Sequence, residues 1–275
     1  MPDLFSLEGR VAVVTGGSGA LGSRACLALA GAGAAVGVLA RDANRIEAVV
    51  AEIGAAGGDA FAVPADVRDR AGLEQARELV LDHRGRLDVL VNAAGGNLSE
   101  ATIEPDGTFF DLPPGMFDAV FRLNAQSTVL ACQVFGRALA HSDDEVTGRC
   151  IVNISSMAAD RALTRVAAYG AAKAAVENLT RWLAVELARR FGDGLRVNAI
   201  APGFVVSAQN RALLIEANGD LTDRGRAVVD RTPAGRLGQP EDLDTTLLWL
   251  CSPGSRFVTG VVVPVDGGFS AWSGI

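Results

Sequence analysis

A single tyrosine and a single lysine stand four residues apart in this sequence, in the stretch AAYGAAKAAV. On a helix, Tyr169 and Lys173 would lie on one face, one turn apart. An ammonium group close to a phenol stabilises the phenolate and lowers the tyrosine pKa, so that the hydroxyl can exchange a proton near neutral pH. The pair therefore indicates general acid–base chemistry.

The choice of lysine at this position carries information, because the other 24 of the 25 Lys and Arg residues are arginine. Lysine presents three rotatable donors on a slim stem, which can serve both a ribose and a phenol, whereas the guanidinium of arginine is a broad planar fork. The alternative is a helix that holds one tyrosine and one lysine by chance.

Two further polar residues extend the candidate catalytic set. Ser156 follows the apolar run RCIVNIS, 13 residues before Tyr169, and Asn124 lies in the sequence FRLNAQS. A serine at the end of a strand is usually a turn or cap residue, so Ser156 alone would be weak evidence. The four residues together favour a catalytic interpretation.

Apolar runs and amphipathic stretches alternate along the whole chain, and these elements must position the four residues. The runs predict buried strands at 11–15, 34–40, 60–66, 87–95, 149–155, 196–203 and 259–268. The predicted helices are 20–32, 42–56, 69–83, 114–140, 167–191 and 240–251. This alternation predicts an α/β fold in which helices cover both faces of a parallel sheet. Residues 1–275 are predicted to form one domain.

Two irregular segments, 96–114 and 207–235, each follow a predicted strand. In open α/β folds, ligands bind beyond the carboxyl ends of the strands. Both segments are therefore expected to border a ligand site.

The composition excludes several classes of partner. The net charge of −7 and the pI near 4.9 would repel nucleic acid and acidic membrane surfaces, so a small-molecule ligand is expected. No signal peptide or apolar span appears at the N-terminus, which predicts a cytoplasmic protein. The cysteines are far apart and are predicted to be reduced core residues, with no metal site: Cys26, Cys132, Cys150 and Cys251.

The first predicted strand ends in TGGSGALG, residues 15–22, and leads into a helix. Glycines let such a turn approach a pyrophosphate, whose charge the helix N-terminus favours, although the same pattern can be a structural turn. After the second strand, Ala40 and Arg41 occupy the place where an acidic residue would bind the ribose hydroxyl of NAD. Arg41 could bind a 2′-phosphate instead, so NADP(H) is favoured. The neighbouring Asp42 keeps NAD(H) possible.

The glycine loop resembles the TGxxxGxG motif of the short-chain dehydrogenase/reductase family, with Ala20 in place of the middle glycine. Ser156, Tyr169-x-x-x-Lys173 and Asn124 match the catalytic positions of that family. The resemblance covers essentially the whole chain and implies a doubly wound Rossmann fold with seven parallel strands in the order 3-2-1-4-5-6-7. The predicted cofactor-binding residues are Gly16, Ser18, Gly19, Ala20, Leu21, Arg41, Asp66, Val67, Asn92, Ala93, Ala94, Tyr169, Lys173, Pro202, Gly203 and Val205.

The resemblance also implies a role for each catalytic residue. Tyr169 would protonate a carbonyl oxygen while hydride arrives from the nicotinamide, and Ser156 would hold that oxygen. Lys173 would lower the tyrosine pKa and bind the nicotinamide ribose. Asn124 would anchor a water that resupplies the proton.

Longer stretches, among them AGGN, GTFFDLPPGMF and APGFVVSAQNRALL, are similar to the D-mannonate oxidoreductase, or fructuronate reductase, subgroup. That subgroup is usually associated with NAD(H), from which Arg41 departs. A sugar acid needs a cation for its carboxylate and amides for its hydroxyls. The predicted substrate-binding residues are Asn97, Ser156, Tyr169, Gln209, Asn210 and Arg211, with Arg161 and Arg165 as rival carboxylate ligands.

Other functions remain open at this point. The catalytic residues would equally suit a reductase of another keto-sugar, a polyol or a β-ketoacyl substrate. A dinucleotide sensor without turnover would need only the glycine loop. The resemblance implies a homotetramer, with a dimer possible.

Overall fold

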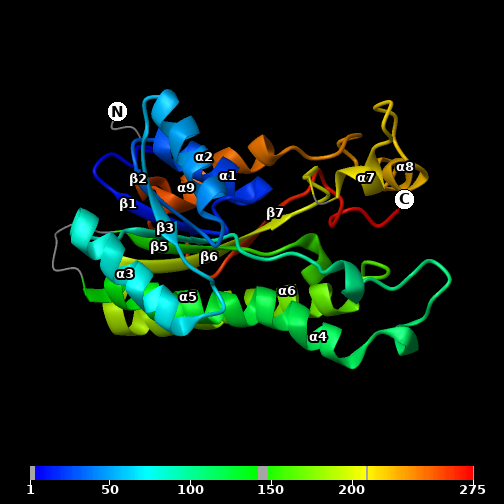
Figure 1. Cartoon of the computed structure of the whole chain (residues 1–275), viewed down its shortest axis with the longest axis horizontal. Helices are drawn as coiled ribbons and strands as arrows, with labels where there is room; N and C mark the ends of the chain where they lie inside the picture. Colours follow the sequence, from blue (N-terminus) through cyan, green and yellow to red (C-terminus); the bar gives the residue numbers. More distant parts are fainter. Residues whose placement is uncertain (1–3, 142–147, 209, 275) are drawn as a thin grey trace.

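A parallel sheet of seven strands runs through the computed structural model, which describes residues 4–141, 148–208 and 210–274 (Figure 1). The strand order β3-β2-β1-β4-β5-β6-β7 confirms the predicted topology. The strands are β1 (Val11–Thr15), β2 (Ala35–Ala40), β3 (Asp59–Pro64), β4 (Val89–Asn92), β5 (Arg149–Ile154), β6 (Leu195–Pro202) and β7 (Val262–Val265).

The central strands are buried on both faces, which explains their unbroken apolar runs. Every residue of β1, β4, β5 and β6 is buried. The strands β4 and β7 are shorter than predicted, because the glycine-rich residues that follow each of them turn away from the sheet.

Helices cover the two faces of the sheet in separate layers (Figure 1). One layer contains α1 (Ala20–Gly31), α2 (Ala43–Ala55) and α9 (Asp244–Cys251). The other contains α3 (Arg70–Arg84), α5 (Ser127–His141) and α6 (Ala167–Phe191).

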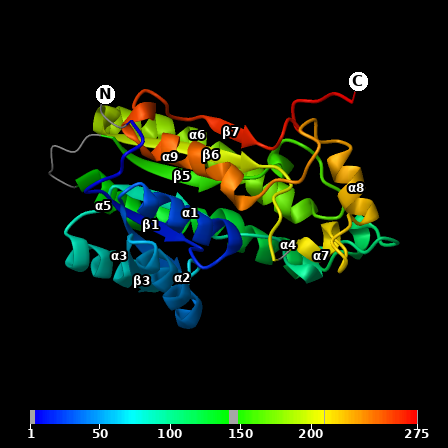
Figure 2. The ribbon, with the colours of Figure 1, turned by 90° about the horizontal axis from the view of Figure 1, so that it is seen from above.

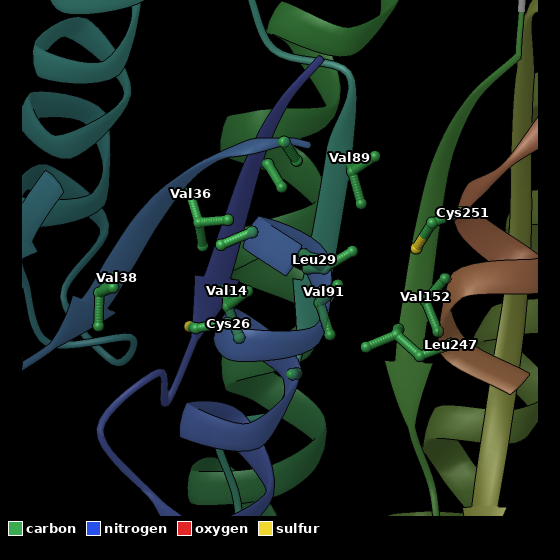
Figure 3. Close-up of a cluster of buried hydrophobic side chains, with 14 of the residues drawn as sticks. Val14, Cys26, Leu29, Val36, Val38, Val89, Val91, Val152, Leu247 and Cys251 are labelled. Atoms are coloured by element: carbon green, nitrogen blue, oxygen red, sulfur yellow. The ribbon is translucent and has the colours of Figure 1, made fainter. Parts of the chain in front are cut away.

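A separate apolar core lies beneath each layer. Figure 3 shows the first core, where Cys26 and Leu29 of α1 and Leu247 of α9 face valines of the sheet. Burying one such valine or leucine contributes about 1.5–3 kcal/mol, so these contacts hold the helices on the sheet. All four cysteines are buried and free, as predicted.

The predicted helix 114–140 is two helices. The first, α4 (Pro114–Phe121), passes into a π-helical turn at Arg122–Gln126 before α5 begins. The side chain of Asn124 donates to the carbonyl of Val120 at 2.8 Å, and Ser127 donates to that of Leu123 at 2.6 Å. These side chains compete with backbone N–H groups for the same carbonyls, and π-helical turns often occur at functional sites.

The two irregular segments lie at one end of the sheet, beyond the carboxyl ends of the strands, together with α4 (Figures 1 and 2). The second segment contains two short helices, α7 (Arg211–Leu214) and α8 (Asp223–Val229). The first contains single 3₁₀ turns at Ser99–Ala101 and Phe109–Asp111. Another 3₁₀ turn, Pro240–Leu243, begins the predicted helix 240–251.

Within the described ranges, no helix combines the length and the apolar composition that crossing a bilayer requires.

Candidate active site

A cleft of about 580 Å³ opens at the carboxyl edge of the sheet. It runs from the start of α1, past the ends of β4 and β5, to the segment after β6. Its walls are Gly19, Ala20, Leu21, Gly22, Arg45, Ala93, Gly95, Gly96, Ile154, Ser155, Ser156, Tyr169, Lys173, Pro202, Gly203, Val205, Ser207, Ala208 and Asn210.

The glycine loop forms one end of this cleft. A β-carbon on Gly16 would lie 2.7 Å from the Cα of Ala94, and one on Gly22 would lie 2.1 Å from the carbonyl oxygen of Gly16. These two positions therefore require glycine. Ala20, which replaces the family's middle glycine, is exposed at the first residue of α1, where a methyl group is tolerated.

The N-terminus of α1 is suited to an anion. Gly19 occupies the N-cap position, and no side chain caps the helix. The first N–H groups of a helix otherwise need such a partner, and their dipole favours negative charge. The loop and this helix end thus fit the pyrophosphate of a dinucleotide.

Tyr169, Ser156 and Lys173 converge in the middle of the cleft, as predicted. Tyr169 and Ser156 both line this part of the cleft, and the Ser156 side chain acts to lower the pKa of the Tyr169 phenol. The Lys173 Nζ lies 5.7 Å from the centre of the tyrosine ring and donates to the Ile154 carbonyl at 2.8 Å. Only 5% of Lys173 and 8% of Ser156 are exposed, so these two side chains are largely shielded from water.

Burial controls the ionisation of this pair. Desolvation raises the pKa of Tyr169, against the opposing effect of the Ser156 side chain. Desolvation also lowers the pKa of Lys173 to about 8, because the charged ammonium is disfavoured. The spacing predicted a lower tyrosine pKa, whereas burial acts on the pKa of the phenol in the opposite direction.

Asn124 is completely buried behind the cleft. Its Oδ1 accepts from the Gly96 N–H at 2.9 Å, and its Nδ2 donates to the Gly96 carbonyl at 2.8 Å. A β-carbon on Gly95 would lie 2.6 Å from the Asn124 Oδ1 and 3.2 Å from the Lys173 Nζ. Asn124 and Lys173 therefore both lie against Gly95, and Asn124 fixes the turn that follows β4.

Several predicted cofactor residues stand behind or beside the cleft wall. Asn92 is buried and donates to Asn153 at 2.9 Å and to Cys132 at 3.3 Å, so its amide joins β4 to β5. Asp66 accepts from Arg68, which lowers the pKa of its carboxyl. Val67 is buried beside it.

The arginine on the cleft wall is Arg45, which the sequence analysis missed. Its Nη2 donates to the Ser18 carbonyl at 2.6 Å, so it lies against the glycine loop. Arg41, which is exposed like Arg45, lies outside the wall. Asp42 caps α2 by accepting from the N–H groups of Asn44 and Arg45. Two sequence features could have indicated Arg45. It stands four residues after Arg41, and it lies in the first turn of the helix that Asp42 caps.

A second missed residue is Glu177, which is buried one turn after Lys173. It accepts from Ser155 at 2.9 Å and from Arg181 at 3.1 Å. Because Ser155 precedes Ser156, this contact supports the end of β5. The regular spacing Tyr169, Lys173, Glu177 could have indicated that all three share one face of α6.

The predicted substrate residues are divided between the cleft and its rim. Asn210 lines the cleft, but its amide holds the local chain by accepting from Ser207 N–H and donating to the Val205 carbonyl, both at 2.8 Å. Arg211 is exposed at the start of α7. Asn97 donates to Thr102 at 2.7 Å, outside the wall. Gln209 lies outside the described residues.

The two rival arginines are bound to backbone carbonyls. Arg161 donates to the Ser270 carbonyl at 3.1 Å, which ties it to the C-terminal segment. Arg165 donates to the Ile103 carbonyl in the first irregular segment. Both guanidinium groups thus connect chain segments. Among the described residues, the Arg211 side chain makes no hydrogen bond or ion pair, so it is the predicted carboxylate ligand that stays available for a substrate.

Comparison with known proteins identifies the family. A family model described as enoyl-(acyl carrier protein) reductase matches residues 17–270. The chain is 48% identical over 279 residues to the uncharacterised oxidoreductase UxuB of Bacillus subtilis, with 98% of each protein covered.

Solved structures give the same result. A proposed D-mannonate oxidoreductase from Haemophilus influenzae, with bound NAD, is 40% identical, covers 98% of each chain and has a TM-score of 0.89. The complex of RhlG from Pseudomonas aeruginosa with NADP is 33% identical, with 98% of this chain and 100% of that chain covered and a TM-score of 0.83. The chain therefore belongs to the short-chain dehydrogenase/reductase family and is an oxidoreductase whose fold binds a nicotinamide dinucleotide.

Proposed function

We propose that this enzyme interconverts D-fructuronate and D-mannonate by hydride transfer with a nicotinamide dinucleotide. The observation that carries the reaction class is the grouping of Tyr169, Ser156 and Lys173 in one cleft, of which the glycine loop forms one end. The sugar-acid substrate is supported by the proposed D-mannonate oxidoreductase at 40% identity and by the sequence stretches shared with that subgroup.

The chain's own groups account for the proton. Tyr169 donates its phenolic proton to the carbonyl oxygen of the substrate, and Ser156 holds that oxygen by a hydrogen bond. Lys173 stabilises the phenolate that forms, because its ammonium lies over the Tyr169 ring. Asn124 fixes the turn after β4, which borders Lys173 in the cleft.

The dinucleotide would lie between the glycine loop and the segment after β6. The uncapped start of α1 would hold the pyrophosphate, and Pro202, Gly203 and Val205 would border the nicotinamide, which supplies or accepts the hydride. A β-carbon on Gly203 would lie 2.7 Å from Asp266, so this turn also requires glycine.

NADP(H) is the proposed cofactor, with NAD(H) as the alternative. No acidic side chain is available at the end of β2 within the described structure, because Ala40 and Arg41 stand there and Asp42 caps α2. Arg45 adds a guanidinium on the cleft wall. A 2′-phosphate would pair with these cations, whereas a ribose hydroxyl would lack its usual carboxylate acceptor.

Arg211 is the proposed carboxylate ligand of the substrate. It stands at the rim of the cleft, next to Asn210, and its side chain is exposed. Asn97 and Gln209 remain predicted partners of the substrate hydroxyls.

The test is the rate at which the purified protein oxidises NADH and NADPH with D-fructuronate. We expect turnover with D-fructuronate and a higher kcat/KM for NADPH. The absence of turnover with both cofactors would refute the substrate, and another keto-sugar, polyol or β-ketoacyl compound would then be sought in a substrate panel. Tight dinucleotide binding without turnover of any carbonyl would instead indicate a sensor.

A homotetramer, or a dimer, is the proposed assembly. The outer faces of α5 and α6 form an apolar groove of about 310 Å³. Trp182 and Val185 of α6 are 60% and 61% exposed, and Phe191 is 40% exposed. Such apolar exposure suits a contact between two copies of the chain. Light scattering that gives a monomer mass would contradict this proposal. The cytoplasmic location also stays a prediction.

A further inference from the structure

Arg165 has an unusual backbone conformation. Its φ is 74°, and it is the one residue other than glycine with a positive φ in the described part of the chain. Residues with a β-carbon rarely adopt this left-handed conformation, which persists where surrounding contacts hold it. Arg165 stands between Ser156 and Tyr169, four residues before the tyrosine.

The contacts of Arg165 converge on one residue of the first irregular segment. The Ile103 N–H donates to the Arg165 carbonyl at 2.9 Å, and the Arg165 Nε donates to the Ile103 carbonyl. Backbone and side chain of Arg165 thus bind the two polar groups of the same residue. The guanidinium also lies 3.7 Å from the carboxylate of Glu104, whose side chain is 76% exposed, so that ion pair contributes little.

The bonded segment packs against the catalytic tyrosine. Ala101 of this segment, Val120 of α4 and Ala168 of α6 form a small apolar cluster, and the partly buried Leu98 and Tyr169 pack against it. The cluster thus joins the segment to the part of the cleft where Tyr169 lies.

The same segment is fixed at its beginning by another residue of the site. Asn124 makes two hydrogen bonds to Gly96, and the Arg165 contact holds the chain seven residues later, at Ile103. Asn97, a predicted substrate ligand, lies between these two points.

We propose that Arg165 is a positioning residue that sets segment 97–104, which follows the cleft residue Gly96, beside Tyr169, and so determines the affinity for the carbonyl substrate. This inference rests on the proposed function, because it requires a substrate that contacts the segment. The left-handed turn is what lets the carbonyl and the guanidinium of one residue face the same partner.

Three variants test the contact between Arg165 and Ile103 separately from the rest of the loop that contains Arg165. Arg165→Gly keeps the left-handed conformation accessible and removes the guanidinium. Arg165→Lys retains a cationic donor on a long stem. Arg161→Ala is the matched control, because it removes an arginine of the same loop whose guanidinium binds the Ser270 carbonyl instead.

Kinetics provide the first readout. We expect Arg165→Gly to raise the KM for D-fructuronate about ten-fold, with kcat within about two-fold and the dinucleotide Kd unchanged, because the segment affects substrate binding alone. Arg165→Lys should recover part of the loss, and Arg161→Ala should keep the parent KM. An equal rise in KM for Arg161→Ala would overturn the proposal, as would a parallel rise in the dinucleotide Kd.

Amide hydrogen exchange provides a readout that needs no substrate. In Arg165→Gly, amides in 97–104 should exchange about ten-fold faster, while those of β5 and α6 keep the parent rates. Unchanged exchange in 97–104 would overturn the proposal. If the parent does not turn over D-fructuronate, the proposed substrate is wrong, yet the exchange measurement still decides whether Arg165 positions the segment.

Discussion

The two sides of the catalytic cleft differ in burial. On the side formed by β5 and α6, Ser156 is 8% exposed and Lys173 is 5% exposed, and both have hydrogen-bond partners within the protein. On the other side, the irregular segments present exposed residues such as Phe110, at 92%, and Arg211. The buried side is built from regular elements, whereas the exposed side is built from turns and short helices.

This difference in burial suggests that the chemical step depends on the buried side and the choice of substrate on the exposed side. The buried groups are fixed by the sheet and by the helix behind it, so one carbonyl oxygen position is defined for any substrate. The exposed segments can change without disturbing the sheet, because few core contacts depend on them. We therefore expect substitutions on the buried side to affect the turnover of every substrate. Substitutions on the exposed side should affect which substrate is bound.

Replacing the catalytic phenol should have the largest effect. Tyr169→Phe removes the proton donor and is expected to lower kcat about 10³-fold, with dinucleotide binding nearly unchanged. Steady-state rates and a fluorescence titration with the reduced cofactor measure the two quantities. Turnover within a few-fold of the parent would contradict the assignment of the buried side as the reacting side.

Lys173 allows the cost of burial to be measured through pH. The folded protein loses this proton at a pKa of about 8, whereas an unfolded lysine titrates near 10.4. Between these values the unfolded state binds more protons, so the contribution of Lys173 to the free energy of unfolding rises with pH, by about 2 kcal/mol from pH 8 to 10.

Lys173→Met removes the buried charge, and we expect it to stabilise the protein most at or below pH 8. The gain should shrink by the same amount toward pH 10, as measured by urea unfolding of both proteins. Parallel stability curves for parent and variant would show that Lys173 titrates normally.

Arg45 tests the cofactor end of the cleft. Arg45→Ala should raise the Kd for NADPH about ten-fold and change that for NADH by less than about two-fold, because a lost charge-assisted bond affects only the 2′-phosphate. Arg41→Ala, on the exposed residue outside the wall, serves as the comparison. Equal losses for the two cofactors would mean that Arg45 acts only by supporting the Ser18 carbonyl.

The smallest effect is expected on the exposed side. Arg211→Ala should raise the KM for D-fructuronate about five-fold, since a solvated ion pair contributes little, and should leave the KM of an uncharged ketose unaffected. Arg224→Ala, on a half-buried arginine of the same irregular segment, is the control. Equal changes for charged and uncharged substrates would remove Arg211 as the carboxylate ligand.

The hydrophobic pattern predicted most of the fold, because buried parallel strands need unbroken apolar runs and the covering helices need amphipathic ones. It did not predict the break between α4 and α5. That break depends on Asn124, whose amide takes the Val120 carbonyl and also binds Gly96, 28 residues earlier in the chain. A contact between distant segments leaves no periodic signal.

The arginines show that the contacts of the candidate site were also not predictable from sequence position. Sequence position made Arg161 and Arg165 as plausible as Arg211 for a carboxylate, and made Arg41 more plausible than Arg45 for a phosphate. The structure separates them, because the carbonyls of Ser270, Ile103 and Ser18 bind Arg161, Arg165 and Arg45. A long flexible side chain can reach many partners, so its target depends on the packing of the loops around it.

The sequence by itself determined the family of folds and the glycine loop, and it predicted the chemistry proposed for Tyr169, Lys173, Ser156 and Asn124, because these depend on residue type and short spacing. The tertiary structure alone decided how strongly burial changes the pKa values of the tyrosine and the lysine, and which segments the arginines join. Those properties arise from desolvation and from contacts between residues far apart in the chain, which local sequence patterns do not encode.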